Sequence, residues 1–321
     1  ISDLAEKKFE ALKNVTIEKS DDIKTYINLL PDGSTLKAEF RKLTENGFNI
    51  SEIKSWASKN LTMGKIDVNI MTKVDKDNYK NKVKLPVEYN DAHAALRGFA
   101  ESKLKSSVIL SAGMNPRLYA YMSQFDDFYP NEQGEVNKKI ILKVSDYRSA
   151  LIQGKFLAKK GLWVSEYRIE SGLNCGGHAF ATDGYLLGPV LQEFKEKREE
   201  LQISIQHILN QELENQGRVV SEKPFSFKIT AQGGVGTDEE HEFLLNHYEL
   251  DSIGWGTPFL LVPEATTVDK KTLDQLVNAK EEDLYLSDIS PLGVPFNNLK
   301  SNTKDLEKEA IARTRAFRCF E

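Results

Sequence analysis

The stretch "KKIILKVSDYRSALIQGKFLAKKGLWVSEYRIE", residues 138–170, decides the fold class of this chain. Its two apolar runs, residues 138–144 and 162–169, are typical of buried strands, and the residues between them have helical spacing. A strand, a helix and a second strand in this order predict two parallel neighbours joined by a right-handed crossover.

The same alternation continues on both sides of this stretch. Further strands are predicted at residues 65–71, 106–112, 225–231 and 250–255, with helices between them. Six strands that alternate with helices predict an α/β fold built on a parallel sheet. Residues 1–60 instead show helical spacing, with Ser51 as a candidate N-cap. We therefore expect a helical N-terminal segment, residues 1–60, and an α/β domain, residues 61–321, that ends in a helical extension.

Composition restricts the class of protein and its partners. The 321 residues carry a net charge of −5 and are 40% hydrophobic, which is typical of a globular protein. Because lysines and glutamates are interspersed, we expect neither a nucleic-acid nor a membrane partner. Two cysteines, Cys175 and Cys319, predict no disulfide framework and a reducing, cytoplasmic location. The chain opens on Ile1 rather than methionine, so we expect its natural start to be missing.

Two glycine-bearing turns follow the last two predicted strands. They read "AQGGVGT", residues 231–237, and "GWGTPF", residues 254–259. The first runs into a helix predicted to begin near Thr237, where free backbone amides and the helix dipole favour an anion. Either motif alone is equally well explained by a tight turn. Together, at the ends of the last two strands of an alternating chain, they predict a phosphate site.

A third motif, "SGLNCGGHAF" at residues 171–180, sets a histidine behind two glycines. A neutral imidazole can accept a proton near neutral pH, which makes His178 a candidate general base. The flanking Gly176 and Gly177 would let a ligand approach the backbone closely.

The order of these motifs resembles a known family. The succession "KIDVNIM", "VILSAGMNP", "IILKVSDYRSAL", "LNCGGHAF", "ITAQGGVGT" and "DSIGWGTPFL" is similar to the nitronate monooxygenase, or 2-nitropropane dioxygenase-like, family of FMN-dependent (β/α)₈ TIM barrels. The resemblance implies that His178 removes a proton from the substrate or donates to it. It also implies an FMN site, in which Asn69 and Lys143 contact the flavin ring or ribityl chain, Gly176 and Gly177 line it, and Gly233, Gly234, Gly256 and Thr257 hold the phosphate.

The first two strands of such a barrel are not identifiable before Asn69. Six strands do not close an eight-stranded barrel, so three explanations stay open. The sequence begins downstream of those strands, or a second chain or copy supplies them, or the helical residues 1–60 replace them. The first two explanations are favoured, because residues 51–61 suit the helix that leads into the third strand of the barrel.

Three functions are consistent with these motifs. The first is an FMN-dependent monooxygenase acting on a small carbon acid such as a nitronate. The second is a similar FMN-dependent enoyl reductase that uses NAD(P)H and an acyl carrier partner, because such enzymes share turns like "GGVGT". The third is a non-catalytic barrel that binds a phosphorylated metabolite. No metal site is predicted, since His241 and His247 are spaced to lie on different helix faces, and His93 and His207 are interpreted as surface or packing residues.

Overall fold

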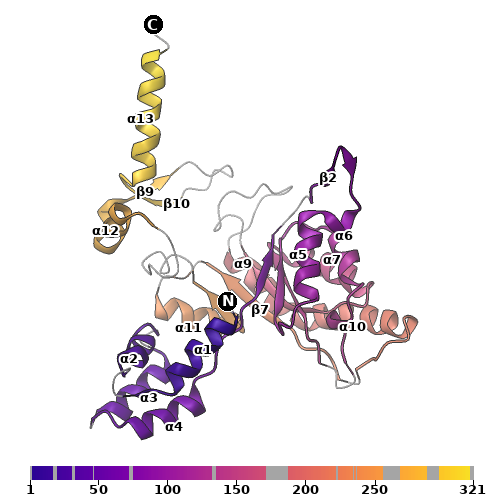
Figure 1. The fold of residues 1–321 in the computed structure, drawn as a ribbon, viewed down its shortest axis with the longest axis horizontal. Helices are drawn as coiled ribbons and strands as arrows, with labels where there is room; N and C mark the ends of the chain where they lie inside the picture. Colours follow the sequence, from indigo (N-terminus) through magenta and orange to yellow (C-terminus); the bar gives the residue numbers. More distant parts are fainter. Residues whose placement is uncertain are drawn as a thin grey trace.

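The computed structural model describes most of the chain (Figure 1). The described residues are 2–16, 20–30, 33–45, 47–71, 75–131, 135–170, 187–221, 223–233, 235, 237–255, 268–287 and 296–318. Among them, no helix combines the length and apolar character needed to cross a membrane.

A six-stranded parallel sheet forms the centre of the molecule. Its strands follow chain order, so each lies beside its predecessor, as consecutive strands of a (β/α) barrel do. All six strands predicted from the sequence are confirmed. They are β1 Val68–Ile70, β4 Ser107–Leu110, β5 Lys139–Val144, β6 Val164–Ile169, β7 Lys228–Gln232 and β8 Ser252–Gly254.

Helices connect the strands and cover one face of the sheet (Figure 1). Ile140, Leu142 and Val144 of β5 face these helices inside one continuous apolar core. The α7 helix lies against β5, β6 and α10. The helices in this layer are α5 Asp91–Ala100, α6 Pro116–Met122, α7 Tyr147–Ala158, α9 Leu187–Glu196, α10 Arg198–Asn215 and α11 Asp238–His247, with short 3₁₀ turns η1 Val87–Tyr89 and η2 Asp126–Phe128.

The opposite face of the sheet is largely polar. Because side chains alternate along a strand, Lys139, Ile141 and Lys143 point away from the helix-facing core. A register shift between Ile140 and Ile141 opposes Glu166 to Ile141, so Glu166 also lies on this face. This polar face of the sheet carries the groups on which the candidate sites depend.

The predicted helical character of residues 1–60 is confirmed. A second apolar cluster of buried residues, including Ile23, Phe40 and Ile53, joins helices α1 Ser2–Lys13, α2 Ser20–Asn28, α3 Thr35–Thr44 and α4 Ile50–Asn60. The predicted cap is wrong by two residues. Asn49 caps α4, because its side-chain oxygen accepts a hydrogen bond from the amide of Ser51 at 3.1 Å.

Two smaller sheets lie outside the central one (Figure 1). Strands β2 Tyr79–Lys80 and β3 Val83–Lys84 form an exposed hairpin between β1 and α5, with Asn81 and Lys82 at positive φ in its turn. Near the C-terminus, β9 Leu284–Ser287 pairs with β10 Phe296–Leu299, alongside α12 Lys270–Asn278, η4 Glu281–Asp283 and α13 Thr303–Arg318.

Asp269 joins the starts of helices α12 and α13 through hydrogen bonds that depend on pH. We call this contact the Asp269 junction. Hydrogen bonds from Thr272 and from the hydroxyl of Thr303 lower the pKa of Asp269 from 3.8 to about 2. A lowered folded-state pKa stabilises the junction above pH 3.8, and this stabilisation is lost as the pH falls toward 2. We expect the Thr272 amide resonance to shift between pH 4 and 2 in an NMR titration. Asp269→Asn should remove this transition, and a shift that survives in the variant would contradict the assignment.

Two buried tyrosines, Tyr119 and Tyr167, should respond differently to substitution by phenylalanine. Tyr119 donates a hydrogen bond to Gln153 Oε1 at 2.8 Å, whereas the Tyr167 hydroxyl has no partner among the described residues. Tyr119→Phe should lower the free energy of unfolding by about 1 kcal/mol, and Tyr167→Phe should leave it unchanged or raise it. Urea denaturation of both variants measures this difference, and an equal loss in both would contradict it.

Candidate functional site

Three of the predicted flavin-site residues lie in the described part of the chain, toward the carboxyl ends of their strands. Asn69 is in β1, Lys143 is in β5, and Gly233 directly follows β7. Because the strands are parallel, their carboxyl ends meet at one edge of the sheet, which we call the carboxyl edge. The other predicted site residues lie outside the described residues: His178, Gly176, Gly177, Gly234, Gly256 and Thr257.

Lys143 has a carboxylate partner at the carboxyl edge. Its Nζ lies 2.5 Å from Oε1 of Glu170, the first residue after β6, and both side chains are more than four-fifths buried. The Glu170 amide also donates to the carbonyl of Val144 at 2.9 Å, which fixes the two strand ends together. Glu170 is not marked as this partner by any motif in the sequence. A ligand bound at the carboxyl edge would therefore lie near the Lys143–Glu170 ion pair.

The turns after β7 and β8 start side by side. Gly233 adopts a φ of 76°, which favours glycine, and its amide donates to the carbonyl of Gly254 at 3.1 Å. Among the described residues, and apart from the two chain neighbours of Gly233, no atom lies within 4 Å of the position that a Cβ would take there, so these residues leave the space beside this backbone open. A bulky anion can therefore approach this turn.

The helix that follows this turn begins where it was predicted. Thr237 caps α11 in a capping box, in which its hydroxyl accepts from the amide of Glu240 at 3.2 Å and Glu240 accepts from the amide of Thr237. The first turn also carries Asp238 and Glu239, whose charges offset the positive end of the helix dipole. The described start of this turn, at Gly233, leaves room for a phosphate, but the acidic first turn of α11 means that the helix dipole would add little attraction.

A buried acid–histidine pair lies near the start of α5. Oδ2 of Asp75 lies 2.5 Å from Nδ1 of His93, and the two side chains are 6% and 1% exposed. Asp75 also accepts hydrogen bonds from the backbone amides of Ala92 and His93, at 3.0 and 3.3 Å. The ring of Tyr121 packs 5.0 Å from the imidazole. The pair anchors the segment after β1 to the first turn of α5, and His93 is thus a packing residue.

The two histidines of helix α11 contact aromatic side chains of the protein. His241 accepts a hydrogen bond from the indole of Trp255 at 2.8 Å, and His247 stacks on Phe243 with ring centroids 4.8 Å apart. No group of three potential metal ligands occurs within the part of the chain that the structure describes.

Comparison with known proteins identifies similar solved structures, each at low sequence identity. No family model and no curated protein matches the chain. Among solved structures, it is similar to the enoyl reductase domain of MlnA from the macrolactin biosynthesis cluster of Bacillus amyloliquefaciens, with 16% identity and a TM-score of 0.46 over 80% of this chain and 57% of that one. It is also similar to FabK from Thermotoga maritima, with 17% identity and a TM-score of 0.39 over 83% of this chain and 65% of that one. The chain thus spans less than two thirds of either structure.

Proposed function

We propose that this chain belongs to an FMN-dependent oxidoreductase of the nitronate monooxygenase type, oxidising a small carbon acid with oxygen as the electron acceptor. The observation that carries the proposal is the open Gly233 turn, joined to the end of β8 on the same edge as the buried Lys143. The motif order in the sequence supports the same cofactor. FMN, when bound, supplies a ring that takes up two electrons.

Each of the chain's own residues has a distinct task in this proposal. Gly233 and Gly234, with Gly256 and Thr257, would bind the phosphate through backbone amides. Asn69 and Lys143 would hold the ring or ribityl chain. His178 would take the proton from the carbon acid, because a neutral imidazole is a competent base near pH 7. Gly176 and Gly177 would leave room for the substrate beside the ring.

The visible absorption spectrum of the purified full chain tests the proposal. We expect flavin bands, either as purified or after addition of FMN, that bleach anaerobically with a small nitroalkane. Bleaching by NADPH, followed by reoxidation with an enoyl substrate, would instead favour the enoyl reductase alternative, to which the "GGVGT" turn also points. Absence of FMN binding would reject both and leave a barrel that binds a phosphorylated metabolite at the same turns.

The Lys143–Glu170 pair predicts how the flavin potential responds to charge. Glu170→Gln leaves the Lys143 ammonium without its counter-charge, which favours the anionic reduced ring. We expect the two-electron midpoint potential of bound FMN to rise by about 30 mV, equivalent to about 1.4 kcal/mol. Lys143→Met should lower it by a similar amount.

Dye-coupled reductive titration measures both shifts. Glu166→Gln is the matched control, because Glu166 lies in β6, four residues before Glu170, and is paired with Arg168 at 2.8 Å. Glu166→Gln should shift the midpoint potential of the flavin less than Glu170→Gln does. Equal shifts for Glu166→Gln and Glu170→Gln would show that Lys143 does not lie beside the ring.

A further inference from the structure

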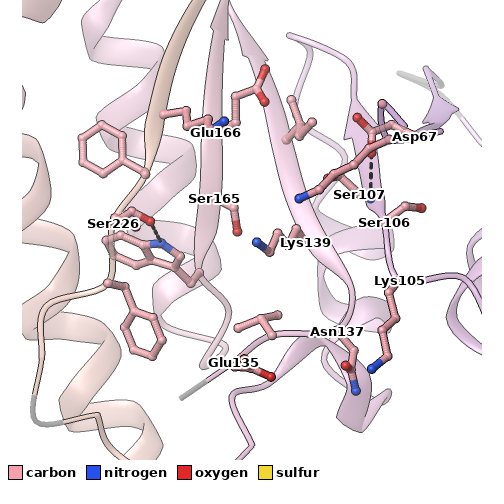
Figure 2. A pocket seen from close by; sticks show the side chains of 18 of the residues that line it. Asp67, Lys105, Ser106, Ser107, Glu135, Asn137, Lys139, Ser165, Glu166 and Ser226 are labelled. Carbon is pink, nitrogen blue, oxygen red and sulfur yellow. Dashed lines mark hydrogen bonds between the residues drawn. The ribbon is translucent and has the colours of Figure 1, made fainter. Parts of the chain in front are cut away.

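A cavity of about 680 Å³ lies at the opposite edge of the sheet from the proposed flavin site. Its walls are formed where β4, β5, β6 and β7 begin, which we call the amino edge (Figure 2). Ile141, Trp163, Phe225 and Phe227 form an apolar part of the wall. Its volume is in the range of small-molecule sites, and it is far larger than a single ion requires.

Lysine side chains converge on this cavity. Lys65, Lys139 and Lys228 all line it, and the burial of Lys139 together with the charges of Lys65 and Lys228 lowers the pKa of Lys139. None of these three ammonium groups forms an ion pair with a carboxylate among the described residues. Figure 2 shows the ends of Lys139 and Ser165 pointing into the middle of the cavity. Lys65 and Lys228 are exposed and Lys139 is partly buried, so an anion that enters the cavity would reduce the repulsion felt most strongly at Lys139.

The carboxylates in the cavity wall do not offset these charges fully. Asp67 accepts a hydrogen bond from the amide of Ser107 at 2.9 Å. Glu166 is paired with Arg168 and accepts from the hydroxyl of Thr230, each at 2.8 Å. Glu135 is the remaining acidic residue, and its charge opposes the shift in the pKa of Lys139. The lining carries four lysines, Lys65, Lys105, Lys139 and Lys228, against three carboxylates, of which Glu166 is already paired with Arg168, so positive charge is in excess in the cavity wall.

We propose that the cavity at the amino edge binds a phosphate-bearing small molecule. Its phosphate would lie among Lys65, Lys139 and Lys228, with the Ser165 hydroxyl as a further donor. The rest of the ligand would rest against Phe225 and the other apolar residues of the wall. Several ammonium groups and a hydroxyl match the several oxygens of a phosphate better than a single carboxylate. This site is separate from the Gly233 turn, because the two lie at opposite ends of the strands, and it does not depend on the proposed function.

Thermal unfolding of the full chain with inorganic pyrophosphate tests this proposal, at an ionic strength held constant with KCl. We expect the midpoint temperature of the native chain to rise by about 3 °C or more at saturating anion, because a ligand of the folded state stabilises it. Lys139→Met should lose this rise, while without the anion it should melt at or above the native midpoint. Lys228→Met, at an exposed side chain, should also lose the rise and serves if Lys139→Met does not fold.

Two control variants locate the anion. Lys80→Met, on the exposed β2–β3 hairpin, and Thr237→Ala, beside the proposed flavin phosphate turn, should both keep the rise. No rise in the native chain would overturn the proposal. A rise that survives in Lys139→Met and Lys228→Met but disappears in Thr237→Ala would also overturn it, because the anion would then bind at the carboxyl edge.

Discussion

Asp75→Ala is expected to lower the free energy of unfolding by about 3 kcal/mol, the largest stability effect of the substitutions considered. The side chain accepts three hydrogen bonds in a buried setting, from the amides of Ala92 and His93 and from the His93 ring. Its removal leaves two helix amides and a buried imidazole without their partner. The free-energy cost of leaving these buried donors unpaired should exceed the cost of the small cavity that the substitution creates.

Urea denaturation followed by far-ultraviolet circular dichroism measures this loss. Asp75→Asn should cost less, because its amide oxygen can still accept from the two α5 amides. Asp77→Ala is the matched control on the same loop, since Asp77 pairs with Lys84, whose side chain is 56% exposed, and should change stability little. Comparable losses for Asp75→Ala and Asp77→Ala would show that the buried pair does not anchor α5.

The strands were predictable because their apolar runs are local signals. Each of the six has an apolar helix-facing side, such as Ile140, Leu142 and Val144 in β5, and this periodicity is present in the sequence alone. The cap of α4 was harder to predict. Asn49 and Ser51 are both good N-cap residues, and only backbone geometry decides between them.

Which side chains meet at each site could not be predicted from the sequence, because the contacts join residues far apart in the chain. Glu170 pairs with Lys143 across neighbouring strands, and Asp75 reaches His93 across the hairpin insertion. The three lysines proposed to bind the phosphate, Lys65, Lys139 and Lys228, come from three separate segments, each of which begins or precedes a strand. Periodicity assigns such residues to a face of the sheet, but it does not say which of them meet, because that depends on strand register.

The chemical prediction with the largest effect concerns His178. As a general base, it would contribute about 10²–10⁴-fold to the rate, so His178→Ala should lose that factor in kcat with a neutral nitroalkane. The preformed nitronate has already lost the proton, so its oxidation should be affected far less. The ratio of the two losses therefore separates proton removal from substrate binding.

Anaerobic flavin reduction by stopped flow gives both rates directly, and His207→Ala, on helix α10, serves as the matched control. The flavin spectrum of His178→Ala should match that of the native chain, because the phosphate turns lie after other strands. An equal loss with the nitroalkane and the nitronate would make His178 a donor that orients the substrate. Unchanged rates with the nitroalkane and with the nitronate would show that His178 takes no part in the reaction. The proton acceptor would then have to come from another loop at the carboxyl edge.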